Sequence, residues 1–182
     1  MMKNYAAKLS IVATLFILAG AMQAVAQENP APTSAEIVAL DECDPATFNA
    51  ALGPDFCHNV ALGFSTTLSD LFAKAAAGTP DPGWDFEPDE VSIKKGGTLT
   101  VVDQGGEPHT FTEVKQFGGG FIEPLNAGEA IAPECSGGFS NITVARTRLL
   151  QGSQLHVSGL AKGEHLFECC IHPWMRVKVR VQ

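Results

Sequence analysis

A cysteine, a histidine and a methionine recur at three-residue spacing near the C-terminus, in the stretch FECCIHPWM. Cys169, His172 and Met175 place a thiolate, an imidazole and a thioether within seven residues, so that one tight loop can aim all three at a single point. Soft sulfur ligands combined with imidazole favour copper over magnesium or calcium. The stretch therefore predicts a copper site.

A second imidazole is expected from elsewhere in the chain. Copper sites that transfer electrons combine two histidines and one cysteine with a weak axial methionine. His109, at the head of the stretch EPHTFTEV, is the candidate, although 60 residues separate it from Cys169. The separation is no obstacle, because a β-sandwich returns distant segments to the same end. We interpret His58, His156 and His165 as surface or structural residues, with a supporting role at the site left open for His165.

Short strands must position these ligands. From about residue 86 the chain is rich in Val, Ile and Thr and is punctuated by glycine pairs, which is typical of a sandwich or barrel. In the last stretch, RVKVRVQ, the valines at 177, 179 and 181 alternate with Lys178 and Arg180. This alternation predicts a half-buried antiparallel strand.

Helices are expected before residue 86. The stretch DPATFNAALGP predicts a short helix with Asp44 as N-cap, Pro45 in its first turn and Gly53 at its end. The stretch STTLSDLFAKAAAGTP has apolar residues at helical spacing and predicts a second helix. Residues 27–35 are expected to form a mobile leader.

The N-terminus has the pattern of a secretory signal peptide. Lys3 and Lys8 precede the apolar run LSIVATLFILAGAM, and AVA then predicts cleavage after Ala26. An N-terminal anchor helix is the alternative. We therefore expect a signal peptide at 1–26, an N-terminal extension with two short helices at 27–85 and the copper-binding domain at 86–182.

Export and charge limit the function classes. The predicted signal peptide removes two lysines and no acidic residue, which leaves 10 basic against 20 acidic residues and a net charge of −10. Such a chain lacks the basic surface that nucleic-acid binding requires. No other apolar run approaches 18 residues, so no membrane span is expected in the mature protein. We expect a periplasmic or secreted monomer.

The motifs together resemble the cupredoxins, the small blue-copper proteins that include plastocyanin, amicyanin and pseudoazurin. The resemblance covers roughly residues 86–182 and rests on FEPDEVSIKKGGTLTVV, EPHTFTE and GEHLFEC-x-x-HPWM. The short C-x-x-H-x-x-M loop is most similar to that of amicyanin. The resemblance implies an all-β, cupredoxin-like Greek-key β-sandwich, to which this chain adds a short helical N-terminal extension.

The same resemblance implies one type 1 copper ion near one end of the sandwich. By position, its ligands are His109, Cys169, His172 and Met175. The family often has an asparagine before the first histidine, where this chain reads VVDQGGE. The hydrogen bonds that support the site are therefore expected to differ, and such bonds tune a metal site.

An electron carrier that serves redox protein partners is the function that the resemblance implies. His172 is then expected near the surface as the electron exit, with Pro173 and Trp174 in an apolar rim that docks a partner. The alternative for Trp174, to which we give equal weight, is that it is simply packed within the loop and docks no partner. A copper-binding module for storage, delivery or sensing is the alternative function. An enzyme is not expected, because the chain lacks His-x-His, Cys-x-x-x-Cys and Cys-x-x-Cys motifs.

Spacing and strand alternation select Cys169 over its neighbour Cys170. Only Cys169 gives the C-x-x-H spacing to His172. Phe167 and Cys169 fall on one face of the predicted strand, whereas Glu168 and Cys170 fall on the other. We expect the charged Glu168 to face solvent, so that Cys169 points inward to the metal.

Four cysteines then remain, and they allow three disulfide pairings. In an exported chain we favour Cys43–Cys57, which closes the first helical segment, and Cys135–Cys170, which ties the ligand loop to a glycine-rich loop. Free buried thiols are the alternative.

Overall fold

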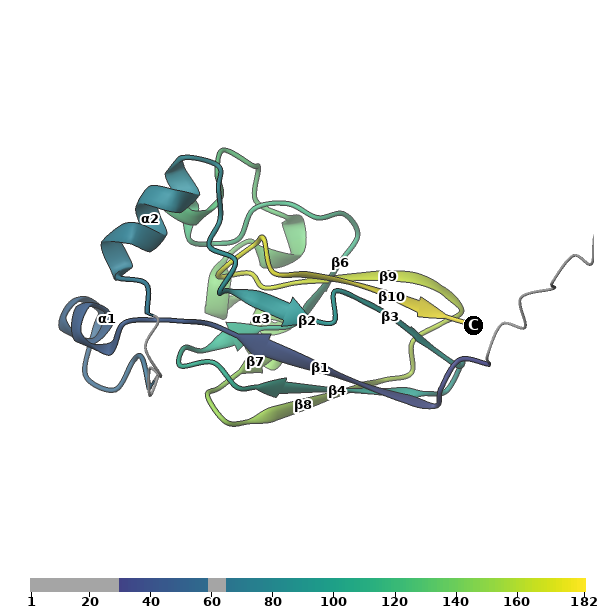
Figure 1. The fold of residues 1–182 in the computed structure, drawn as a ribbon. Coiled ribbons are helices and arrows are strands. Elements are labelled where there is room, and N and C mark those ends of the chain that lie inside the picture. Colours follow the sequence, from purple (N-terminus) through teal and green to yellow (C-terminus); the bar gives the residue numbers. More distant parts are fainter. Residues whose placement is uncertain (1–29, 59–64) are drawn as a thin grey trace, which may run out of the picture.

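Two four-stranded β-sheets pack face to face and form the core of the fold (Figure 1). The computed structural model describes residues 30–58 and 65–182. The first sheet has the strand order β2-β1-β4-β8, with β2 (Asp85–Glu87), β1 (Ser34–Leu40), β4 (Thr98–Asp103) and β8 (Gln154–Ser158). The second has the order β3-β10-β9-β6, with β3 (Glu90–Ile93), β10 (Arg176–Val181), β9 (Gly163–Glu168) and β6 (Thr112–Val114). The predicted all-β sandwich is confirmed.

Strand β10 shows the predicted alternation. Its three valines are buried, whereas Lys178 and Arg180 are exposed. The strand pairs antiparallel with β9, as predicted, and also parallel with β3. Strand β1 likewise runs parallel to β4 in the other sheet. A short ladder of β5 (His109–Thr110) and β7 (Arg148–Leu149) lies beside the two sheets.

Aromatic rings fill the space between the sheets. The ring of Phe111 stacks on that of Phe167 with centroids 4.4 Å apart, and it meets the edge of Phe86 at 5.3 Å. All three side chains are almost completely buried. Because Phe111 follows β5 and Phe167 precedes the ligand loop, this stack joins the segments that carry His109 and Cys169.

The N-terminal extension contributes a strand that the sequence analysis missed. Residues 34–40 form β1, the strand between β2 and β4, whereas the sequence analysis expected a mobile leader at 27–35 and named only two short helices in the rest of the extension. Ile37 and Ala39 are completely buried in the core, whereas Glu36 is exposed. The extension is thus paired into the sandwich, and the predicted leader is wrong for residues 34 and 35. The predicted signal peptide at 1–26 lies outside the described residues.

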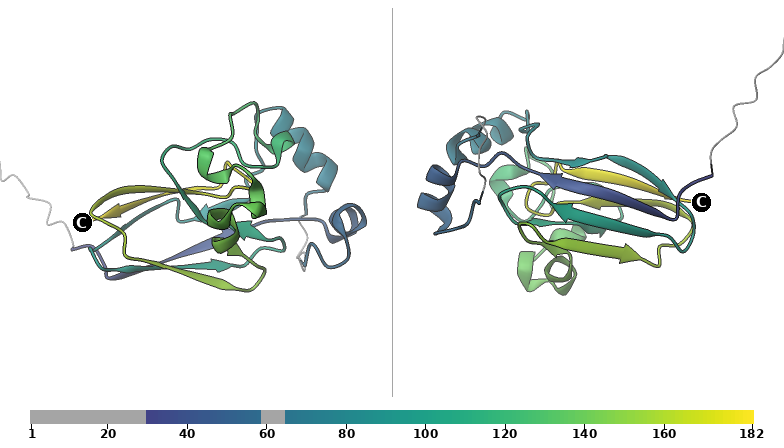
Figure 2. Two further views of the ribbon diagram at one scale, coloured as in Figure 1. Left: turned by 180° about the vertical axis from the view of Figure 1, so that it is seen from behind. Right: turned by 60° about the horizontal axis from the view of Figure 1, so that its bottom comes forward.

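Both predicted helices are present. Helix α1 (Pro45–Leu52) begins at Asp44, whose side chain accepts a hydrogen bond from the Thr47 amide, and it ends at Gly53. Helix α2 (Leu68–Ala76) begins after the cap Thr67. Both helices lie beyond the end of the sandwich opposite the C-terminus (Figures 1 and 2). No helix within residues 30–58 and 65–182 is long and apolar enough to cross a membrane.

A long connection between β6 and β7 covers the outer face of the second sheet near the ligand loop. It contains three short 3₁₀ helices and one α-helix: η1 (Glu123–Leu125), η2 (Pro133–Cys135), η3 (Gly138–Ser140) and α3 (Ile142–Arg146). Gly120 lets it approach closely, because a Cβ there would lie 2.1 Å from the carbonyl oxygen of Cys170. A second apolar cluster forms beneath it, with Val114, Ala132, Cys135, Val144 and Cys170.

Candidate metal centre

Three of the predicted ligands converge at the helical end of the sandwich. One potential ligand atom each of His109, Cys169 and His172 lies within 4.8 Å of the others. The Cys169 Sγ is 3.8 Å from Nδ1 of His109. All three side chains are almost completely buried. The structure thus brings together residues that are 60 positions apart in the sequence.

The local folding of the ligand loop follows from the β9–β10 hairpin. The register pairs Arg176 with Glu168, so the residues between them form the turn at the end of the hairpin. The Cys169 amide donates to the Met175 carbonyl at 3.0 Å, and the Met175 amide donates to the His172 carbonyl at 3.0 Å. Two backbone hydrogen bonds therefore fix the positions of the three loop residues relative to one another.

Met175 is the predicted fourth ligand. Its side chain is completely buried and belongs to the main apolar core. The backbone bonds above place its Cα in the same turn as Cys169 and His172. Its role as an axial ligand stays a prediction.

The sulfur of Cys169 lies among hydrogen-bond donors. The backbone amides of Thr110 and His172 each donate to Sγ at 3.5 Å. Burial raises the pKa of the Cys169 thiol, but contacts with His109 and His172 outweigh burial and hold that pKa well below its usual range. The surroundings therefore favour a thiolate, which is the form that binds metals.

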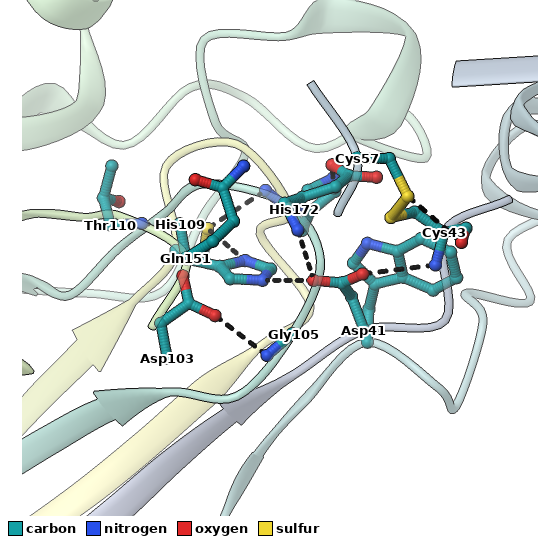
Figure 3. A network of polar contacts seen from close by, with 12 residues as sticks. Asp41, Cys43, Cys57, Asp103, Gly105, His109, Thr110, Gln151 and His172 are labelled. Carbon is teal, nitrogen blue, oxygen red and sulfur yellow. Dashed lines mark hydrogen bonds and ion pairs between the residues drawn. A yellow bond between two sulfur atoms is a disulfide. The ribbon is translucent and has the colours of Figure 1, made fainter. Parts of the chain in front are cut away.

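Each imidazole faces a buried carboxylate on its Nε2 side. Nε2 of His109 lies 3.1 Å from Oδ2 of Asp41 (Figure 3). Nε2 of His172 lies 3.4 Å from Oε2 of Glu107. Burial lowers the pKa of His109, but the hydrogen bonds to Asp41 and Cys169 outweigh burial and raise it well above its usual value. Carboxylates on the outer nitrogens leave the Nδ1 atoms for a metal.

An unpaired nitrogen supports a metal at this position. Nδ1 of His172 is buried and has no hydrogen-bond partner among the described residues. Buried polar atoms without partners are rare in native proteins. A metal ion held by His109, Cys169 and His172 would give this nitrogen a partner. The donor set of one thiolate and two imidazoles fits copper or zinc, and a thioether from Met175 would favour copper.

Cys170 points away from the site, as predicted, and forms a disulfide with Cys135. Its amide donates to the Thr110 hydroxyl at 2.7 Å. The expectation that Glu168 faces solvent is wrong: the Glu168 side chain is completely buried. The β6–β7 connection covers this face of the sheet, and the Gly118 amide donates to Glu168 at 3.0 Å.

The other favoured disulfide, Cys43–Cys57, is also present and links the end of the β1 segment to the residues after α1. Cys169 is the free cysteine of the chain. The structure therefore contains both disulfides that the sequence analysis favoured.

His172 was expected near the surface, and the structure covers its ring almost completely while leaving it at the wall of an apolar pocket. Its side chain is 2% exposed, and its ring adjoins two tryptophans, with centroids 6.1 Å from that of Trp84 and 5.6 Å from that of Trp174. Pro173 is buried and Trp174 is half-buried. The Trp174 indole donates to the Trp84 carbonyl at 3.2 Å. The predicted apolar rim is thus a packed layer from which Trp174 reaches the surface.

Sequence reasoning missed Asp41, Trp84 and Glu107. Asp41 and Trp84 belong to the predicted extension, which was not expected to reach the metal site. Glu107 was passed over as a loop residue in VVDQGGE. The sequence departs there from the family pattern, and that departure was the available signal.

Comparisons with known proteins give a likeness at the level of shape. No protein-family model matches the chain, and no curated protein matches it. The solved structure of a novel purple cupredoxin from Nitrosopumilus maritimus is 15% identical, with 81% of this chain and 99% of that chain covered and a TM-score of 0.39. A reduced amicyanin mutant is 20% identical, with 54% and 73% covered and a TM-score of 0.35. Likenesses at this level assign no ligand and no function to the chain.

Proposed function

We propose that this chain is an exported, cupredoxin-like type 1 copper protein that carries single electrons between redox protein partners. The ligands are His109, Cys169, His172 and Met175, and they hold one copper ion. The observation that carries the proposal is the buried convergence of Cys169 Sγ with His109 and His172, in which the outer nitrogen of each ring faces a carboxylate.

When bound, copper supplies the redox chemistry, because it accepts and returns one electron as it alternates between Cu(II) and Cu(I). The protein residues hold the ligands in one arrangement for both states. Loop hydrogen bonds fix Cys169 and His172 relative to Met175, and the aromatic stack beneath the site joins the two ligand-bearing segments. The burial of His109, Cys169 and His172 limits the access of water to the site.

Trp174 is the residue that we assign to partner contact. Its ring adjoins that of His172 at 5.6 Å and is partly exposed, so it lies between the buried ligand and the surface. The preceding residue, Pro173, is buried. The proposed route therefore leaves through Trp174 rather than directly from His172.

Copper storage or delivery is the second candidate function. The observation that favours it is the 2% exposure of the His172 side chain, since a ligand covered by protein slows direct exchange with a partner. In that case the same residues hold Cu(I) tightly without rapid electron transfer.

Copper titration combined with an electron-exchange measurement tests the proposal. We expect one equivalent of copper to bind to the mature protein, with binding lost in His109→Ala and in Cys169→Ser. We also expect rapid electron exchange between Cu(I) and Cu(II) forms and slower exchange with a partner in Trp174→Ala. One bound copper with slow exchange in the wild-type protein selects storage, and absence of copper binding refutes both functions.

A further inference from the structure

Asp41 lies directly after β1 and is buried at the metal site. Its side chain is completely inaccessible to solvent. Oδ2 contacts Nε2 of His109 at 3.1 Å, and Oδ1 accepts a hydrogen bond from the Cys43 amide at 3.2 Å (Figure 3). Oδ2 also accepts a hydrogen bond from the Glu107 amide at 2.9 Å. An ionised carboxylate only accepts hydrogen bonds, so Nε2 of His109 is the donor in this pair.

We propose that Asp41 is a positioning residue that orders both histidines of the metal site. This inference rests on the proposed copper site. By holding a proton on Nε2 of His109, Asp41 leaves Nδ1, which lies 3.8 Å from Cys169 Sγ, for the metal. A partner on the outer nitrogen also fixes the orientation of the ring.

Asp41 acts on the second histidine, His172, through Glu107. The backbone amide of Glu107 is bound to Asp41, and its side-chain Oε2 lies 3.4 Å from Nε2 of His172. Gly105 allows the loop to close over Asp41, because a Cβ at that position would lie 2.0 Å from Asp41 Oδ2. The Asp41 carboxylate therefore orients the His109 ring directly. It orients the His172 ring indirectly, because it fixes the position of the Glu107 backbone.

A disulfide bond next to Asp41 in the sequence restrains the position of this carboxylate. Cys43, two residues after Asp41, is bonded to Cys57. Asn49 of α1 binds the Cys57 backbone in both directions, donating to its carbonyl at 3.1 Å and accepting from its amide at 2.7 Å. The extension that precedes residue 86 thus builds part of the metal site, rather than merely covering the sandwich.

Paired substitutions separate this positioning role from a general effect of charge. Asp41 uses both carboxylate oxygens as acceptors, whereas the amide in Asp41→Asn offers one, so at least one set of hydrogen bonds is lost. Asp103→Asn is the matched control. Asp103 is also buried beside His109, but its Oδ1 accepts from the Gly105 amide and it makes no hydrogen bond to either imidazole among the described residues.

The test uses the full mature protein and two measurements. Competition with a Cu(I) chelator measures affinity, and NMR of the ¹⁵N-labelled Cu(I) protein observes the Nε2 proton of His109. We expect Asp41→Asn and Asp41→Ala to weaken Cu(I) binding by roughly 10- to 100-fold and to lose or shift the Nε2 proton signal. We expect Asp103→Asn to retain that signal and to bind more tightly than Asp41→Asn.

Three results decide the outcome. Wild-type affinity together with an unchanged Nε2 proton signal in Asp41→Asn overturns the inference. An equal loss of affinity in Asp41→Asn and Asp103→Asn also overturns it, if both variants retain the Nε2 proton signal of His109. Circular dichroism of the metal-free variants checks folding, and if Asp41→Ala does not fold, Asp41→Asn carries the test. A wild-type protein whose copper binding does not depend on Cys169 refutes the proposed copper site itself.

Discussion

Removing the disulfide between Cys135 and Cys170 should destabilise the protein measurably. The bridge spans a sequence separation of 35 residues and joins the ligand loop to η2. The loop-entropy relation for this separation gives about 4 kcal/mol at 25 °C. The separation of 14 residues between Cys43 and Cys57 gives about 3 kcal/mol by the same relation.

The perturbation is the double substitution Cys135→Ala and Cys170→Ala in the metal-free protein. Alanine is preferred to serine, because both positions are completely buried and a hydroxyl would need a partner there. Guanidinium unfolding gives the free energy of unfolding, with Cys43→Ala and Cys57→Ala as the comparison pair. A loss below about 1 kcal/mol for the Cys135 and Cys170 pair would refute the reasoning from chain entropy.

Three further predictions concern the core and two titrating groups, and chemical unfolding of each variant measures them. Phe111→Ala should cost about 3–5 kcal/mol, because its ring is buried against the aromatic stack; a cost below about 1 kcal/mol would contradict this packing. The hydrogen bond to Glu113 raises the pKa of His165, so its stabilisation is present below pH 6.5 and is lost as pH rises through the raised pKa. The stability gap between wild type and His165→Gln should therefore be larger at pH 5.5 than at pH 9, and an equal gap would refute the pairing. Burial raises the pKa of Glu168 to about 7, so the folded state keeps a proton that the unfolded state loses near pH 4.5. Wild type should therefore lose stability relative to Glu168→Gln between pH 4.5 and 7, and a pH-independent difference would exclude this assignment.

The sequence predicted the parts of the site that depend on spacing and alternation. The C-x-x-H spacing and the strand faces separated Cys169 from Cys170, and both disulfides appear as favoured. Cap residues predicted α1, since Asp44 and Gly53 act at its two ends through local backbone geometry. These features are encoded within a few residues of one another.

Features that depend on what covers a surface were not predicted. Glu168 occupies an outward position on its strand, but the β6–β7 connection covers it, and strand alternation carries no information about such a cover. The burial of His172 has the same cause, because Trp84 comes from a segment distant in sequence. Asp41 follows a strand whose parallel partner β4 lies about 60 residues further along the chain, and local patterns do not specify that pairing.

Addition of Cu(II) to the purified protein, followed by its visible spectrum, is the decisive measurement for the proposed copper site. We expect an intense blue thiolate-to-copper band in the wild type. The band should persist in the variant with Cys135→Ala and Cys170→Ala, and it should be absent in Cys169→Ser. A colourless wild-type protein, or a band that survives in Cys169→Ser and disappears when Cys170 is replaced, would contradict the assignment of Cys169 as the copper ligand.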